Sequence, residues 1–196
     1  FSSIEMFKEK EGIIFIGPNP ETMEAMGDKI SARIKMIEAG VPVVPGTQEN
    51  LKSVEEAVEL CNKIGYPVML KSTAGGGGIG LTRCADGEAL QQAWDSVRRL
   101  GEQFFSDAGV FVERCVDRAR HIEVQIFGDG KGNVVALGER DCSLQRRNQK
   151  LVEEAPAPFL TEEIQQQILN SAQAICRAAG YVGAGTVEYL LSRDGK

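Results

Sequence analysis

The 196-residue sequence has a single histidine, a single tryptophan and no Cys-x-x-Cys pair. Structural zinc sites are built from closely spaced cysteines and histidines, so this composition excludes the common zinc-binding modules. The five cysteines are odd in number and widely spaced, and most lie in apolar patterns. They therefore favour buried thiols in a reducing compartment over disulfides.

Long basic runs and long apolar runs are also missing. The basic residues cluster only as short pairs, and the net charge of -6 argues against a nucleic-acid-binding surface. The sequence shows no signal peptide, lipidation signal or apolar stretch long enough to span a membrane. We therefore expect a soluble, cytoplasmic protein whose partners include neither nucleic acid nor a membrane.

The most unusual stretch present is KSTAGGGGIG at residues 71–80. Consecutive glycines are costly to order, so inside a folded domain they predict a loop whose amides approach an anionic ligand such as phosphate. Apolar runs at 67–71 and 81–84 are typical of strands, which predicts a flap over phosphates rather than a Walker or dinucleotide-binding loop. A flexible surface linker is the simpler alternative, but linkers seldom lie between two apolar strands.

Residues 1–42 are expected to form the end of an N-terminal α/β unit and a connecting helix. An apolar run at 13–16 ends in Gly17-Pro18, and isoleucines at helical spacing predict a helix over 28–39. The proline-rich segment that follows predicts an extended linker and a subdomain boundary.

Residues 43–116 are expected to form a small α+β lid, and residues 117–196 the first part of a further subdomain. The lid has two helices, capped by Ser53 and Asp86, around the glycine flap. The last region has an alternating strand, a hairpin and a helix capped by Thr161.

The alternating strand at 120–126 should carry apolar residues on one face and polar residues on the other. Its polar face would present His121, Glu123 and Gln125. For Glu123 and Gln125, and for Glu163 in the following helix, we favour the simpler interpretation of solvated surface groups.

Five segments, in order along the chain, resemble the biotin carboxylase module of the ATP-grasp superfamily. They are MGDK at 26–29, KSTAGGGGIG at 71–80, RHIEVQ at 120–125, ERDCSLQRRNQK at 139–150 and GTVE at 185–188. Several linked motifs of this length are a specific signal, unlike the glycine pattern alone. The resemblance implies an α+β fold, the ATP-grasp fold with a glycine-flap lid subdomain, preceded by the tail of an α/β unit.

The resemblance also implies an activity, which is the ATP-dependent conversion of bicarbonate to carboxyphosphate followed by carboxylation of biotin. ATP and Mg²⁺ or Mn²⁺ would be the cofactors, and biotin would be carried on another domain. The implied partners are bicarbonate, a biotinylated carrier domain and a carboxyltransferase domain, and the family often forms homodimers.

Site residues follow from the resemblance position by position. The phosphate ligands would be Lys29, Lys71, Gly77 and Gly78. The rest of the nucleotide would be contacted by Glu113, Arg114, Val116, His121, Gln145 and Asn148. Lys150, at the bicarbonate side, and Glu188 would be catalytic, and Glu188 would bind Mg²⁺, an ion that usually takes only one or two protein carboxylates.

Two departures from the family pattern shape the expectation. Many biotin carboxylases have Gln-Arg-Arg-His-Gln-Lys where this chain has Asn148, and this asparagine together with the KSTA segment resembles urea carboxylase and urea amidolyase most. The sequence ends at Lys196, before the family's second metal carboxylate, asparagine and catalytic arginine, and it has no Met-Lys-Met biotin-attachment site. We therefore expect this fragment alone to bind nucleotide weakly and not to complete the carboxylation cycle.

Three alternatives remain at this stage. The chain could belong to an acyl-CoA or pyruvate carboxylase, or it could be an ATP-binding module without catalysis. A protein kinase is disfavoured because neither the His-Arg-Asp catalytic loop nor Asp-Phe-Gly occurs.

Overall fold

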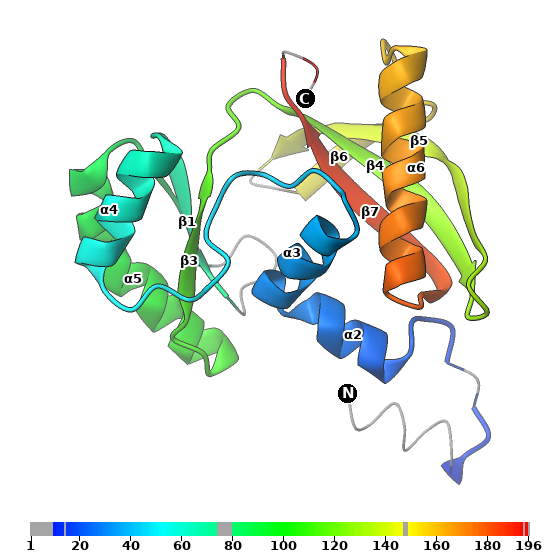
Figure 1. The fold of residues 1–196 in the computed structure, drawn as a ribbon, viewed down its shortest axis with the longest axis horizontal. Coiled ribbons are helices and arrows are strands. Elements are labelled where there is room, and N and C mark those ends of the chain that lie inside the picture. The colour runs from blue at the N-terminus through cyan, green and yellow to red at the C-terminus, as the bar shows by residue number, and fades with distance from the viewer. Residues whose placement is uncertain (1–9, 14, 74–79, 147–148, 194, 196) are drawn as a thin grey trace. The chain divides into compact units, whose positions relative to one another are not determined.

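The chain forms two compact units (Figure 1). Unit 1 comprises Phe1–Gly27, Lys35–Val41 and Arg118–Lys196, and unit 2 comprises Asp28–Ile34 and Pro42–Asp117. The computed structural model describes residues 10–13, 15–73, 80–146, 149–193 and 195. The expected boundaries at 42/43 and 116/117 remain predictions.

Unit 2 is a three-stranded antiparallel sheet covered by two helices. The sheet has the order β2-β1-β3. Its elements are β1 (Val68–Ser72), β2 (Leu81–Cys84), β3 (Val110–Arg114), α4 (Val54–Ile64) and α5 (Gly87–Phe105). Figure 1 shows both helices on one side of this sheet, where α5 packs on β1 and α4 on α5. The helix α3 (Lys29–Glu38) contributes its first turns to this unit.

Both helices of unit 2 begin where the capping residues predict. The Ser53 side chain accepts a hydrogen bond from the Glu56 amide at 3.2 Å, and the Asp86 carboxylate accepts one from the Ala89 amide at 2.9 Å. These bonds satisfy amide groups that have no partner within the helix. The apolar stripes that follow form one core with the alternate residues of the strands, which are Ala57, Cys61, Leu90, Trp94, Val97, Val68, Leu70, Val110 and Val112.

Unit 1 is a four-stranded antiparallel sheet of order β6-β5-β4-β7. Its elements are α2 (Pro20–Gly27), β4 (Arg120–Asp129), β5 (Val134–Arg146), β6 (Gln149–Glu154), α6 (Glu162–Ala178) and β7 (Val182–Leu191). In Figure 1, α6 lies across one face of this sheet and packs on β4 and β5. The predicted alternation is confirmed, since Ile122, Val124 and Ile126 are fully buried in the core with α6.

The β4–β5 hairpin forms at its predicted turn. The Asp129 carboxylate accepts hydrogen bonds from the amides of Lys131 and Asn133, at 2.7 and 3.0 Å. One register shift, between Gln125 and Ile126, interrupts the pairing of β4 with β5. This β-bulge decides which side chains meet on the polar face of the sheet.

The N-terminal apolar run forms no regular element among the described residues. Ile13 and Ile16 lie outside any strand, and Ile16 is 88% exposed. Further along, Thr22 in α2 donates its hydroxyl hydrogen to the Ala179 carbonyl oxygen at 3.0 Å, which ties α2 to the end of α6.

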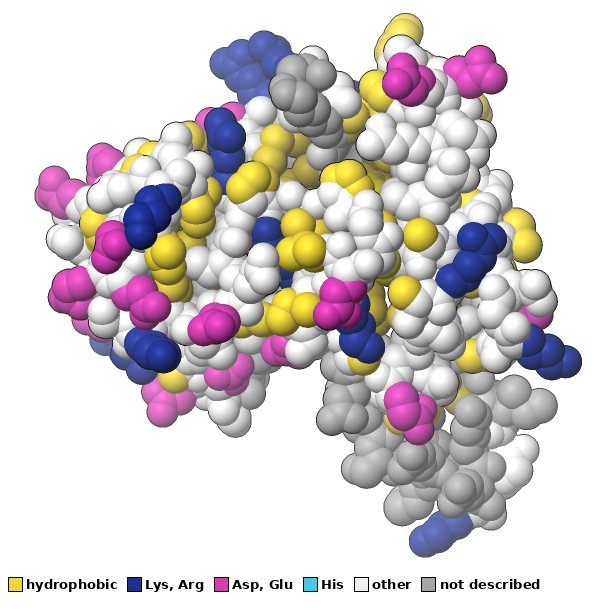
Figure 2. Space-filling model, in the orientation of Figure 1, with side chains coloured by type: hydrophobic (Ala, Val, Ile, Leu, Met, Phe, Trp, Pro, Cys, Tyr) yellow, Lys and Arg dark blue, Asp and Glu magenta, His cyan; other side chains and the backbone are white. Residues whose placement is uncertain are grey.

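Figure 2 shows Asp and Glu side chains spread over the visible face of α4 and α5, with Lys and Arg side chains scattered among them. Four of the five cysteines, Cys61, Cys84, Cys142 and Cys176, are buried free thiols, as their apolar surroundings predict. Of the helices that the structure describes, none combines the length and the apolar character needed to cross a bilayer.

Candidate active site

A half-buried carboxylate between two cations occupies one edge of unit 2. Oε1 of Glu113, in β3, accepts a hydrogen bond from Nη1 of Arg33 at 3.0 Å, and Oε2 accepts one from Nζ of Lys71. The strand register places Lys71 opposite Phe111, so Lys71 and Glu113 are diagonal neighbours on one face of the sheet. We call Arg33, Lys71 and Glu113 the Glu113 cluster.

Lys29 adds a third cation beside this cluster. Its Nζ donates to the Ser72 carbonyl oxygen at 3.0 Å and lies 5.9 Å from the centre of the Phe111 ring, as Nζ of Lys71 also does. Burial and the nearby Lys71 charge lower the pKa of Lys29, although Glu113 acts in the opposite direction. Three cationic side chains thus gather near one carboxylate, and the excess positive charge favours an anionic ligand.

A second carboxylate, in unit 1, has more side-chain partners. Glu123 in β4 is fully buried, and its Oε1 lies 2.9 Å from Nε2 of His121 and contacts Nζ of Lys150. Its Oε2 accepts from Arg140 at 3.0 Å (Nε) and lies 2.7 Å from Nη2. We call Glu123, His121, Arg140 and Lys150 the Glu123 cluster.

Glu188 lies beside this cluster and is the exposed carboxylate of the group. It is paired with Glu123 across β7 and β4, 57% of its side chain is exposed, and its Oε1 lies 3.2 Å from Nζ of Lys150. Ligand atoms of His121, Glu123 and Glu188 lie within 4.8 Å of one another. Because Glu123 is already paired with Arg140 and Lys150, Glu188 is the carboxylate of this group that could hold a Mg²⁺ ion, which usually keeps several waters.

A family model described as "Carbamoyl-phosphate synthase L chain, ATP binding domain" matches residues 28–196, which is most of the chain. The chain belongs to this family. The Glu113 and Glu123 clusters therefore belong to a member of this ATP-binding family.

The relatives that this chain is similar to include biotin carboxylases and a putative urea carboxylase. Biotin carboxylase 2 of Bacillus subtilis (strain 168) is 47% identical over 94% of this chain and 42% of its own length. The putative urea carboxylase of Emericella nidulans is 45% identical over 93% of this chain and 15% of its own length. The solved biotin carboxylase-beta-gamma-ATP complex from Campylobacter jejuni has a TM-score of 0.95 and 42% identity, covering 100% of this chain and 44% of that chain.

These comparisons confirm the expected fold, which is the α+β ATP-grasp fold of biotin carboxylases. The chain spans less than half the length of the relatives named above. A plain biotin carboxylase and a putative urea carboxylase are similar to it at nearly the same level, so the family alone does not single out urea as the acceptor.

The described site residues expected from the sequence fall into two groups, one in each unit. Lys29, Lys71 and Glu113 meet in unit 2, while His121, Lys150 and Glu188 meet in unit 1. Gly77, Gly78 and Asn148 lie outside the described residues.

The remaining expected ligands have less distinctive surroundings. Arg114 is exposed at the end of β3, and Val116 follows it, half-buried. The Gln145 side chain donates to the Cys142 carbonyl oxygen at 2.8 Å. Their assignment to the nucleotide rests on the resemblance and stays a prediction.

The expectation that Glu123 and Gln125 are solvated surface groups is wrong. Glu123 is fully buried, and the Gln125 side chain accepts from Arg140 at 3.0 Å and donates to the Gly185 carbonyl oxygen at 2.8 Å. Burial alone would raise the pKa of Glu123, but the hydrogen bond and charge of Lys150, with Arg140 and His121, lower it to about 2. Glu163 is exposed, as expected.

Arg33 and Arg140 are site residues that the sequence reasoning did not single out, although Arg140 lies within the ERDCSLQRRNQK motif at 139–150. Each donates to a carboxylate that also binds a lysine. Arg33 lies outside the five motif segments, and the motif that contains Arg140 does not indicate that its partner is Glu123, so both pairings are found only through the fold.

Proposed function

We propose that this chain forms part of the ATP site of a biotin carboxylase, which uses ATP and Mg²⁺ to convert bicarbonate to carboxyphosphate and then carboxylates biotin. The observation that carries the proposal is the pairing of lysines with carboxylates in both clusters, at the positions where the family motifs place phosphate, bicarbonate and metal ligands. Phosphoryl transfer depends mainly on positioning and charge neutralisation, which such groups supply.

The two lysines of unit 2 would neutralise the phosphate chain of ATP. Lys29 is fixed by its bond to the Ser72 carbonyl oxygen, and Lys71 is aimed by Glu113. Both ammonium groups have flexible stems and can redirect toward an incoming anion. In the proposed function, Lys29 and Lys71 therefore bind and orient the phosphates and do not transfer a proton.

In unit 1, Glu188 would hold Mg²⁺ and Lys150 would orient bicarbonate. Bound Mg²⁺ would neutralise charge on the phosphate oxygens as the terminal phosphate is transferred. Lys150 is held by Glu123 and Glu188 in the structure, so its ammonium group is already positioned before a ligand binds. A charge aimed in advance can stabilise the anionic transition state without reorganisation.

For the final acceptor we propose urea, with an acyl-CoA or pyruvate as the alternatives. The proposal rests on Asn148 and on the serine and threonine that precede the glycine loop. Ser72 and Thr73 are buried, and Thr73 Oγ1 lies 2.5 Å from Asn50 Oδ1, so this segment has a polar anchor that an alanine in its place would lack. The proposed partners are a biotinylated carrier domain and a carboxyltransferase domain, the proposed assembly is a homodimer, and the proposed setting is the cytoplasm.

The test is bicarbonate-dependent ADP release by the complete, biotinylated protein that carries this chain. Urea is supplied in one reaction, and acetyl-CoA, propionyl-CoA or pyruvate in others. Stimulation by urea alone supports the full proposal, whereas stimulation by another acceptor keeps the biotin carboxylase function and removes urea. ATP binding without ADP release in any reaction would leave a nucleotide-binding module without catalysis.

A further inference from the structure

Arg33 is a buried arginine at the edge of the Glu113 cluster. It lies in α3 and only 7% of its side chain is exposed. Its Nη1 donates to Glu113 at 3.0 Å, and its Nη2 donates to the carbonyl oxygen of Val44 in the extended segment before α4. The guanidinium is therefore fixed from two sides, by a carboxylate and by a backbone oxygen.

Lys71 is held less firmly than Arg33. Its side chain is 24% exposed, and the hydrogen bond it makes among the described residues is to Oε2 of Glu113. An ammonium on a four-carbon stem can turn away from one anion toward another at little cost. Of the two cations on Glu113, Lys71 is thus the one that can leave.

We propose that Arg33 is a positioning residue that keeps Glu113 neutralised when Lys71 turns from Glu113 to the phosphates of a bound nucleotide. This inference rests on the proposed function. Without Arg33, the departure of Lys71 would leave Glu113, which is 19% exposed, with no ion-pair partner among the described residues and next to an incoming polyanion. Arg33 removes that penalty because its bond to Oε1 does not compete with Lys71 for Oε2.

A double-mutant cycle in the complete protein tests this role. The variants are Arg33→Met, Glu113→Gln and the combination of both, and the measurement is the dissociation constant of ATP by calorimetry. Loss of one charge-assisted interaction corresponds to about a tenfold change, so Arg33→Met should weaken ATP binding about tenfold. In the double variant no carboxylate remains to retain Lys71, and ATP affinity should return to within about threefold of Glu113→Gln alone.

The cycle separates a charge role from a structural one. Loss of the Val44 hydrogen bond is common to Arg33→Met and to the double variant, so a purely structural role would leave both equally weak. Arg33→Lys keeps the charge but not the two-sided geometry, and it should keep ATP affinity within about threefold while lowering the melting temperature. If Arg33→Met does not fold, Arg33→Gln takes its place with the same expectation.

A matched control comes from the same unit. Arg83 pairs with Asp117 at 3.0 Å, but these side chains are 50% and 54% exposed, so Arg83→Met should leave ATP affinity unchanged. Unchanged affinity in Arg33→Met, or no rescue by Glu113→Gln, would overturn the inference while wild-type ATP binding still supports the proposed function. Absence of ATP binding in the wild type would instead remove the proposed function itself.

Discussion

The Glu113 and Glu123 clusters are similar in composition but differ in burial. Each has one glutamate, one arginine and one lysine, and Glu123 has His121 in addition. Glu123 is wholly inaccessible and lies on a strand with neighbours on both sides. Glu113 is 19% exposed and lies at the end of β3, a strand at the edge of its sheet.

The difference indicates which cluster can change during a reaction cycle. A fully buried carboxylate must keep its partners, because desolvated charge without a counter-charge is strongly unfavourable. A carboxylate near the surface can exchange partners, since water compensates part of the loss. We therefore expect the Glu123 cluster to be a fixed element of unit 1 and the Glu113 cluster to rearrange when ligand binds.

The largest effect should come from removing the buried carboxylate. Glu123→Ala removes the buried carboxylate between Arg140 and Lys150 and leaves these cations only the exposed carboxylates of Glu153 and Glu188, so it should cost unit 1 about 3–5 kcal/mol of stability. Glu113→Ala should cost unit 2 only about 1–2 kcal/mol, because its site is partly solvated. Hydrogen exchange of the β4 and β3 amides measures each loss locally, and equal losses would remove the distinction between a fixed and an adjustable cluster.

Substituting the two lysines should separate binding from turnover. Lys71→Met should raise the KM for ATP about 30-fold with a smaller change in kcat, because Lys71 contributes to ground-state binding of phosphate. Lys150→Met should instead lower kcat about 30-fold, since its proposed role is at bicarbonate. Steady-state kinetics of the complete protein provide the measurement, and the same pattern for both lysines would contradict the division of roles.

A smaller effect is expected at the exposed carboxylate. Glu188→Gln keeps the size of the side chain but removes the charge, and it should raise the Mg²⁺ concentration for half-maximal ADP release about tenfold. Excess Mg²⁺ should then restore most of the rate. Glu162→Gln, at an exposed position in the first turn of α6, is the control that should leave the Mg²⁺ dependence unchanged.

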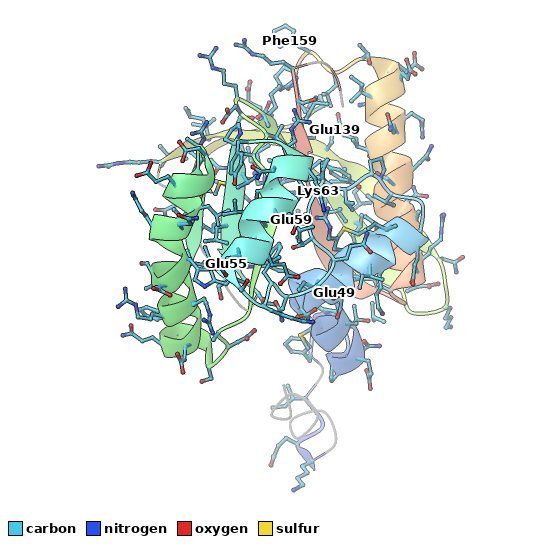
Figure 3. The ribbon with its side chains drawn as sticks, turned by 60° about the vertical axis from the view of Figure 1, so that its left-hand side comes forward. Glu49, Glu55, Glu59, Lys63, Glu139 and Phe159 are labelled. Atoms are coloured by element: carbon cyan, nitrogen blue, oxygen red, sulfur yellow. The ribbon has the colours of Figure 1, made fainter. Side chains whose placement is uncertain are left out.

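The smallest effect should be seen in a lysine–glutamate ion pair that, unlike the two clusters, is exposed to solvent. Glu59 and Lys63 face solvent on α4 (Figure 3), with side chains 73% and 67% exposed and a distance of 2.9 Å. Lys63→Ala should change the free energy of unfolding by less than about 0.5 kcal/mol. A loss as large as that of Glu113→Ala in chemical denaturation would show that burial is not what separates these pairs.

Much of the fold was predictable because local signals agreed with one another. The helices capped by Ser53, Asp86 and Thr161 begin where expected, and the hairpin turns at Asp129. Their cause is local hydrogen bonding, which depends on residues only a few positions apart. The lysines and acidic residues of the motifs were likewise visible without the fold.

The partners of those residues were not predictable, and β4 shows why. Next to the hairpin, Gly128 pairs with Val134 and Ile126 with Ala136. If this register continued along β4 without interruption, Glu123 would lie opposite Glu139. The bulge at Gln125 and Ile126 moves the register by one residue, so that Glu123 lies opposite Arg140 instead. A one-residue shift exchanges the faces of a strand, and no turn signal in the sequence indicates where a bulge falls.

The discontinuous make-up of unit 1 has a consequence for protein synthesis. The described strands of unit 2 have all been translated by Asp117, whereas β4, complete at Asp129, acquires its neighbour β7 only after Leu191, 62 residues later. At roughly 5–20 residues per second, that interval lasts about 3–12 seconds, during which one edge of β4 is unpaired. The polar face of β4, with His121 and Glu123, then lowers the tendency of the growing chain to aggregate through this edge.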